Sequence, residues 1–228
     1  MVAVSDVDPA RAAALARRLR GRVPVLPLAM LIRRSDLVLE AASAAAAPTI
    51  VIRALTARRT VLAMSVGGLL PITGRLRALC RRGGRLLTPS GAIGGLDAIK
   101  AAKLGRLQRV VLTTRKPPAA LGLGRLTAPR TLFRGPASRA VAAFPQNINV
   151  AATLALAGIG PARTKVRIIA DPAVTRNIHE IEAIGTFGRL TVRTENRPSR
   201  DNPKTSALAI LSAQATLQQL ASGWRIGT

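Results

Sequence analysis

The stretch TVLAMSVGGLLPITGRLRALCRRGGRLLTPSGAIGGLDAIKAAKLG, residues 60–105, alternates between two patterns. Short apolar runs that end in Gly-rich turns, within 60–68 and 84–95, are typical of buried strands. Each is followed by a segment with helical spacing, at 71–84 and 96–105, and the first of these helices is closed by a glycine pair. Strand and helix in strict alternation predict an α/β fold with a parallel, doubly wound sheet.

The same alternation extends toward the N-terminus. MVAVSD reads as a strand, and the helix after it is expected to begin at Pro9, with Asp8 as its cap. A second strand is predicted at 37–39 and a second helix within 44–59. Residues 1–107 are therefore expected to form a nucleotide-binding domain.

The pattern changes near residue 108. The segments TKVRIIADP, IHEIEAIG and RLTVRTEN alternate apolar and polar residues, which is typical of half-buried antiparallel strands. A long helix is predicted to close the chain, starting at Asn202 and Pro203. Residues 108–228 are thus expected to form a mixed α/β domain, whose last helix can pack back on the first domain.

Composition limits the classes of protein that this chain can belong to. With 228 residues, of which 48% are hydrophobic and 2% aromatic, the chain can bury a core of aliphatic side chains. The single cysteine, Cys80, excludes a disulfide framework and a Cys-based metal site, so no metal is expected. No secretory signal and no unbroken apolar run of about 20 residues is present, which predicts a cytoplasmic protein without a membrane span.

The formal charge of +25 allows two interpretations. Lysine and arginine at this density can neutralise a polyanion such as nucleic acid. However, the basic residues are spread along the chain, and almost no aromatic side chains are available to stack on bases. The alternative is a solvated surface rich in arginine, so a nucleic-acid partner is not expected but stays open.

Three turns of small residues follow successive predicted strands: EAAS at 40–43, SVGG at 65–68 and SGAIGG at 90–95. The carboxyl ends of parallel strands meet at one edge of the sheet, where open α/β folds bind ligands. Asp6, at the end of the first strand, either accepts hydrogen bonds from a ribose or serves only as a helix cap.

His179 is the only histidine of the chain and lies in an alternating strand pattern. It can be a general base, since its unperturbed pKa lies near neutrality, or a structural side chain. Glu180 and Glu182 point to the opposite face of the strand, so they are expected to pair with arginines rather than with His179. Cations for an anionic substrate are available in RKPP, 115–118, and NPKTS, 202–206, and amides in FPQNIN, 144–149.

Together, MSVGG, PSGAIGGLDAIKAAKLG, TTRKPP, NINVAATLALAGIG, ADPAVTRNIHEIEAIGTFG and NPKTSAL closely resemble the L-aspartate dehydrogenases. The resemblance covers nearly the whole chain in the right order. It implies a Rossmann-type domain followed by an α/β domain with the active site and a dimer interface. The implied reaction is oxidative deamination of L-aspartate through iminoaspartate to oxaloacetate and ammonia with NAD or NADP, which feeds NAD biosynthesis.

The resemblance also implies roles for individual residues. His179 matches the catalytic histidine of the family, and Ala92 and Asn149 match positions that contact the cofactor. Asp6 stands where the acid after the second strand is expected; an acid there favours NAD, but nearby arginines can accept the 2′-phosphate of NADP. The remaining expected contacts are Ala42, Ser43, Ser65 and Gly67 for the cofactor, and Asn147, Lys204 and Arg115 for the substrate.

One departure from the family is clear. The family begins with a strand and a G-x-G-x-x-G turn that receives the pyrophosphate, whereas this sequence begins at what resembles the second strand. We therefore expect a truncated Rossmann-type sheet, and either a misassigned start or a remnant that binds cofactor poorly. The second function hypothesis is a catalytically impaired, basic protein that binds polyanions.

Overall fold

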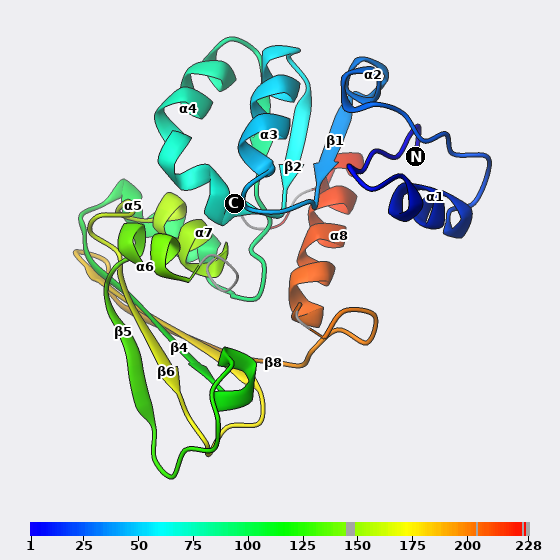
Figure 1. Ribbon diagram of the computed structural model, residues 1–228. Helices are drawn as coiled ribbons and strands as arrows, with labels where there is room; N and C mark the ends of the chain where they lie inside the picture. Colours follow the sequence, from blue (N-terminus) through cyan, green and yellow to red (C-terminus); the bar gives the residue numbers. More distant parts are fainter. Residues whose placement is uncertain (145–148, 204, 225, 227–228) are drawn as a thin grey trace. The chain divides into compact units, whose positions relative to one another are not determined.

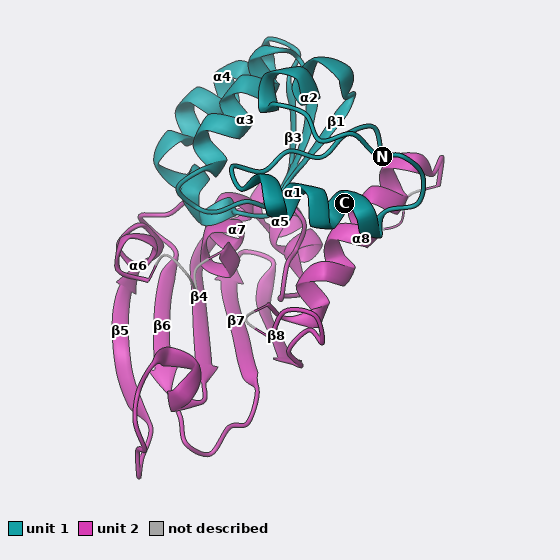
Figure 2. Ribbon diagram, turned by 45° about the vertical axis from the view of Figure 1, so that its right-hand side comes forward, with its two compact units in different colours: residues 1–88 teal, residues 89–228 magenta. Residues whose placement is uncertain are grey.

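The structure is a computed structural model that describes residues 1–144, 149–203, 205–224 and 226. The chain divides into two compact units, Met1–Thr88 and Pro89–Thr228, which Figure 2 shows in different colours. The boundary expected between residues 107 and 108 falls inside the second unit, so residues 89–107 pack with the second unit.

The first unit contains a parallel sheet with the strand order β1 (Leu37–Glu40), β2 (Thr60–Ala63) and β3 (Arg85–Leu87). The expected strand at the N-terminus is reduced to a single parallel bridge between Val4 and Val25. The helical elements of the unit are α1 (Pro9–Arg18), α2 (Leu28–Arg34), α3 (Ala47–Thr56), the 3-10 helix η1 (Val66–Ile72) and α4 (Thr73–Arg81).

Local sequence explains several of these elements. Asp8 caps α1, since its carboxylate accepts hydrogen bonds from the backbone N–H groups of Ala10 and Arg11 at 2.9 and 3.3 Å. The core of the unit lies between the sheet and α3, where Val51 and Val61 are fully buried. The expected parallel sheet is confirmed.

The second unit is built on a five-stranded mixed sheet (Figure 1), and Figure 2 shows its strand order β5-β6-β4-β7-β8. Only β4 and β6 are parallel neighbours, and the other pairs are antiparallel. The strands are β4 (Leu107–Lys116), β5 (Arg130–Pro136), β6 (Lys165–Ala170), β7 (Asn177–Gly185) and β8 (Gly188–Asn196). The helical elements are α5 (Leu96–Leu104), η2 (Pro118–Leu121), α6 (Ala137–Ala143), α7 (Asn149–Ala157) and α8 (Ala207–Ala221).

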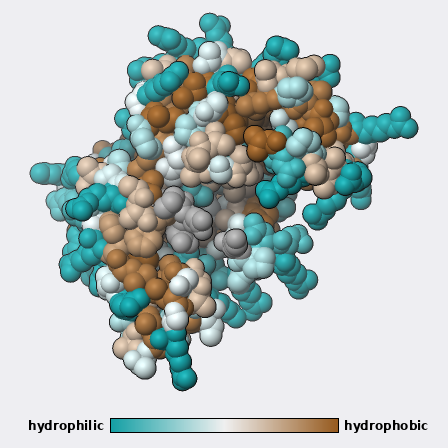
Figure 3. All heavy atoms as spheres, in the orientation of Figure 1, coloured by the Kyte–Doolittle hydropathy of each residue, from teal (hydrophilic) through white to brown (hydrophobic). Residues whose placement is uncertain are grey.

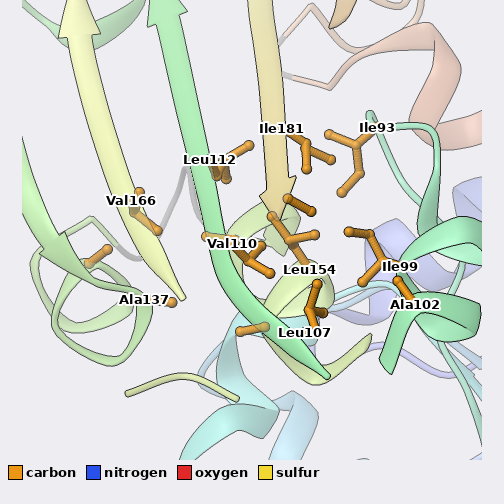
Figure 4. Packing of buried hydrophobic residues seen from close by; sticks show 14 of the residues in the cluster. Ile93, Ile99, Ala102, Leu107, Val110, Leu112, Ala137, Leu154, Val166 and Ile181 are labelled. Carbon is orange, nitrogen blue, oxygen red and sulfur yellow. The ribbon is translucent and has the colours of Figure 1, made fainter. Parts of the chain in front are cut away.

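The two faces of this sheet differ. On what we call the inner face, neighbouring strands place Val166, Leu112, Ile181 and Val192 in one row. Apolar side chains of α5 and α7 pack against this face, and Figure 4 shows Ile99 and Leu154 pointing toward the strands. On the opposite, outer face, the same strands carry mostly arginines, glutamates and threonines.

One predicted helix start is wrong. The final helix begins at Ala207 with Ser206 as the N-cap residue, rather than at Asn202. Before it, the chain forms a loop closed by backbone hydrogen bonds, from Ser199 N–H to the Thr205 carbonyl and from Ala207 N–H to the Arg197 carbonyl. Asn202 lies in a turn of this loop, since its carbonyl accepts a hydrogen bond from Thr205 N–H at 2.9 Å, and does not start the helix.

The visible surface is consistent with basic residues that are spread along the chain. Hydrophilic side chains are spread over the face shown in Figure 3 and alternate with apolar ones. Among the described residues, no helix is long and apolar enough to cross a membrane.

Gly68 allows the turns after β1 and β2 to approach each other. A Cβ built on Gly68 would collide with the backbone carbonyl of Ala44. We expect Gly68→Ala to lower the free energy of unfolding by more than about 2 kcal/mol, because backbone must move. The matched control is Gly74→Ala in α4, where a Cβ meets nothing within 4 Å and alanine favours the helix. Equal stability of the two variants in urea unfolding would contradict this account.

Candidate active site

The inner face of the five-stranded sheet changes from apolar to polar toward the carboxyl end of β4. Along β4, Leu112, Thr114 and Lys116 are buried in alternation, so all three lie on the inner face. Thr114 pairs with Ile168 on one side and with His179 on the other, and Lys116 pairs with Ala170. This polar end of the inner face forms the candidate active site.

His179 is at the centre of this site. It is directly opposite Thr114 of β4 and Thr194 of β8, and its side chain is 4% exposed. Its Nδ1 atom lies 3.0 Å from the Thr114 hydroxyl, which is a hydrogen bond in either tautomer. A ring held through Nδ1 has its second nitrogen, Nε2, left to interact with a ligand.

Burial determines the electrostatics of the site. Burial, as the larger cause, and the positive charge of Lys116 together lower the pKa of His179 to about 4. Burial also lowers the pKa of Lys116 to about 8. At neutral pH, His179 is therefore an uncharged imidazole beside a buried ammonium group.

The outer face beside the site holds charges that pair among themselves. Glu180 accepts a hydrogen bond from Arg193 at 2.7 Å and lies 3.7 Å from Arg115. Glu182 binds Arg189 at 2.6 Å. The expectation that the two glutamates face away from His179 and pair with arginines is confirmed.

Arg115 also lies on the outer face, because it follows Thr114 in the strand. Its guanidinium forms an ion pair with the buried carboxylate of Asp171 at 3.2 Å. The structure therefore does not bring Arg115, an expected substrate contact, to His179. The next residue, Lys116, reaches the inner face instead.

The Gly-rich turn before α5 is attached to the same polar region. The carbonyl of Ala92 accepts hydrogen bonds from the Thr194 hydroxyl at 2.9 Å and from the Asn196 amide at 3.0 Å. Since Thr194 is directly opposite His179, this brings Ala92 close to the histidine. The Gly91 N–H donates to the Ser212 hydroxyl of α8, which holds the turn from the other side.

Glycine is needed where this turn enters the helix. Gly95 has a φ of +74° as the N-cap residue of α5, a left-handed conformation that side chains rarely adopt. A Cβ on Gly95 would also lie 2.7 Å from Cγ2 of Val192. The absence of a side chain at Gly95 thus allows the turn to pack closely against Val192 of β8.

In the first unit, four expected cofactor contacts gather at the carboxyl edge of β1 and β2. Glu40, 2% exposed, accepts hydrogen bonds from the backbone N–H of Ala42 at 2.9 Å and of Ser65 at 3.0 Å. Ala42 and Ser43 are exposed, whereas Ser65 and Gly67 are buried. The buried carboxylate therefore ties together the two turns that small residues had indicated.

The other expected contacts are Asp6, Asn149, Asn147 and Lys204. Asp6 is exposed, and its carboxylate accepts a hydrogen bond from the Asp8 backbone N–H at 2.9 Å. Asn149 is exposed at the first position of α7. Asn147 and Lys204 lie outside the described residues. Within the described parts of the chain, no cluster of three or more His, Cys, Asp or Glu side chains can hold a metal.

Sequence reasoning did not single out Thr114, Lys116, Thr194, Asn196 or Glu40, although Lys116 was named within RKPP and Glu40 within EAAS. The sequence did contain a signal for Thr114 and Lys116. They are two and four residues after the apolar Leu112 in an alternating strand, so they lie on the same face as Leu112. The bonds from Thr194 and Asn196 to Ala92 join residues about a hundred positions apart and leave no local pattern.

Comparison with known proteins agrees with this arrangement. The family model "Aspartate dehydrogenase, C-terminal" matches residues 97–220, and the model "Homoserine dehydrogenase, NAD binding domain" matches residues 1–88. The L-aspartate dehydrogenase of Methanosarcina barkeri is 45% identical over 100% of this chain and 90% of that protein. That of Methanocella arvoryzae is 43% identical over 99% of this chain and 89% of that protein.

A solved structure gives the same result. The aspartate dehydrogenase from Thermotoga maritima aligns with a TM-score of 0.79 and 28% identity, covering 98% of this chain and 88% of that chain. The expected α/β fold with a Rossmann-type first half is confirmed, and the polyanion-binding alternative receives no support. The chain belongs to the L-aspartate dehydrogenase family.

Proposed function

We propose that this chain catalyses the NAD(P)-dependent oxidative deamination of L-aspartate, with His179 as its acid–base residue. The observation that carries the proposal is a buried, neutral imidazole, bonded to Thr114 and next to Lys116, in a chain of this family. The substrate loses a hydride from Cα and a proton from its ammonium group to give iminoaspartate. Water then converts the imine to oxaloacetate and ammonium.

His179 moves the proton in this scheme. With its Nδ1–H donating to the Thr114 hydroxyl, the ring presents the lone pair of Nε2. Nε2 takes the proton either from the substrate ammonium or from the water that attacks the imine. Thr114 acts as a positioning residue, because its hydrogen bond to Nδ1 holds the ring in place and leaves Nε2 to face the substrate.

Several residues support the binding of a dinucleotide. Ala42 and Ser43 are small and exposed after β1, so a flat ligand can approach the backbone at this edge. A Cβ on Gly91, beside Ala92, would meet nothing within 4 Å, so that turn is open as well. The chain contains no G-x-G-x-x-G sequence, so a pyrophosphate cradle of that type is not among its residues. When bound, the cofactor supplies the hydride acceptor.

The remaining expected contacts belong to the same proposal. Residues 1–88 hold the cofactor, with Asp6 toward the adenosine ribose, and the second unit supplies Asn149 and the catalytic machinery. Ser65 and Gly67 shape the edge from inside, since both are buried. Asn147 and Lys204 are proposed to contact the substrate.

The activity test uses oxaloacetate, ammonium and reduced nicotinamide cofactor, with ammonium omitted as a blank. We expect ammonium-dependent oxidation of NADH or NADPH, and a loss of kcat of about 10²- to 10⁴-fold in His179→Ala. Glu182→Gln is the matched control, since Glu182 lies on the same strand and on the outer face. Absence of ammonium-dependent turnover in the wild-type chain would contradict the proposed function.

A second pair of variants tests the positioning of the ring in the same assay. Thr114→Val keeps the shape but removes the hydroxyl, and we expect kcat to fall about tenfold, the value of one hydrogen bond. Thr114→Ser keeps the hydroxyl and is expected to restore most of the activity and the pH profile. Equal losses in the two variants would mean that Thr114 acts only through packing.

Burial of His179 also predicts how stability depends on pH. In the unfolded chain the pKa of His179 is near 6.5, and in the folded protein it is about 4. Between these values the unfolded chain binds the proton first, so stability is lost as the pH falls from 6.5 to 4. Wild type is expected to lose about 3 kcal/mol more than His179→Asn over this range, measured by urea unfolding. Parallel stability curves would contradict a buried, neutral His179.

We further propose a homodimer, as the family resemblance implies. The outer face of the five-stranded sheet carries both signs of charge, with Arg109 and Arg189 more than half exposed beside Glu182. Such a face can pair with a second copy of itself through complementary charges. Sedimentation equilibrium is expected to give twice the chain mass of 23.8 kDa. A monomeric mass at micromolar concentration would contradict the dimer.

A further inference from the structure

Lys116 is the last residue of β4, and its position is well defined by the neighbouring strand. It pairs with Ala170 of β6, and its carbonyl accepts a hydrogen bond from the Asp171 N–H at 2.9 Å. Its side chain is on the inner face and only 8% of the residue is exposed. A lysine is seldom buried to this extent, because an ammonium group loses its hydration.

The same register brings Lys116 to His179. His179 is directly opposite Thr114, and Lys116 is the next residue of β4 on that face. The positive charge of Lys116 acts on the imidazole strongly enough to contribute to its lowered pKa. A ligand that contacts Nε2 of His179 is thus within reach of a buried cation.

We propose that Lys116 binds a carboxylate of the dicarboxylate substrate beside His179, and that this binding increases the basicity of His179. The identity of the substrate rests on the proposed function; the binding of a carboxylate rests on the geometry. Arg115 does not serve this purpose from its position, since it lies on the outer face and pairs with Asp171 and Glu180.

The charges around His179 explain the second half of the proposal. Within the described residues of β4, β7 and β8, Lys116 is the charged side chain on the inner face, and the other polar groups there are Thr114, Asn177, Thr194 and Asn196. Arg115, Asp171, Glu180, Arg193 and Glu195 form ion pairs on the outer face. The Ala92 carbonyl is the nearby backbone dipole that is bonded to Thr194.

A carboxylate bound to Lys116 offsets its positive charge at His179. The pKa of His179 then rises from about 4 toward its ordinary value, because an opposite charge near Lys116 removes part of the repulsion. A base whose pKa lies nearer the working pH accepts a proton more readily. Substrate binding therefore raises the basicity of His179, whereas the imidazole stays a neutral, weak base when no substrate is bound.

The test uses the single histidine as a probe. In the untagged full chain the imidazole resonance of His179 is unambiguous, so its pKa is followed by NMR with and without succinate, a dicarboxylate that cannot be deaminated. In wild type we expect succinate to bind and to raise the pKa of His179. In Lys116→Met we expect a higher pKa in the free protein, at least about tenfold weaker succinate binding, and no further rise on binding.

Two further variants complete the design. Arg109→Gln removes one positive charge from β4 on its exposed outer face and is expected to leave both the pKa and succinate binding unchanged. Lys116→Arg keeps the charge and is expected to retain part of the affinity. Lys116→Met is expected to fold, because exchanging a buried charge for an apolar side chain of similar length removes a desolvation cost.

The outcomes separate this inference from the proposed function. Wild-type affinity for succinate in Lys116→Met, or an unchanged pKa of His179, would overturn the role of Lys116 even if wild type turns over L-aspartate. A wild-type chain that binds succinate with the expected rise in pKa but never oxidises L-aspartate would support the carboxylate site and contradict the proposed function. No response of the wild-type resonance to succinate would overturn the carboxylate site.

Discussion

The pairing of β4 with β7, in the register that sets Thr114 opposite His179, is the constraint on which the second unit depends. Because side chains alternate along a strand, this one register places Leu112 and Ile181 under the helices and His179 beside Lys116. A slip by one residue would bury glutamates in the core and expose the histidine. The apolar core therefore fixes the geometry of the candidate site, since both lie on the same face of the same strands.

This arrangement separates two electrostatic environments within one sheet. On the outer face, Glu180 and Glu182 are partly exposed and pair with arginines, where solvent screens each pair and leaves little net energy. On the inner face, Lys116 and His179 are buried, so their interaction is less screened. The net charge of +25 says little about this site, because one buried lysine affects the histidine more than the many exposed arginines.

Much of the fold could be predicted because it follows local patterns. The alternation of apolar and polar residues in 177–196 predicted β7 and β8. It also predicted that Glu180, the residue after His179, lies on the other face of the strand. The same argument, applied to β4, favours Lys116 over Arg115, because Lys116 lies on the same face of the strand as Thr114 and Leu112. The N-terminal MVAVSD showed the limit of such reasoning, since an apolar run becomes a strand only where neighbours pair with it, and only Val4 forms a bridge.

Two sets of long-range hydrogen bonds could not be predicted from local patterns. In both, side chains bond to backbone groups. In the first unit the buried carboxylate of Glu40 ties the turns after β1 and β2. In the second unit Thr194 and Asn196 hold the carbonyl of Ala92. Each set of bonds costs the burial of polar groups, which hydrogen bonds to backbone offset only when both partners are in place.

The small residues in these turns therefore depend on the polar residues that hold the turns in place. Alanine, serine and glycine let a ligand approach the main chain, but they contribute little packing that would keep a turn in position. The missing rigidity comes from Glu40 in one unit and from Thr194 and Asn196 in the other. The position of the SGAIGG motif thus depends on residues about a hundred positions away, so the sequence of the motif alone does not determine whether the motif can function.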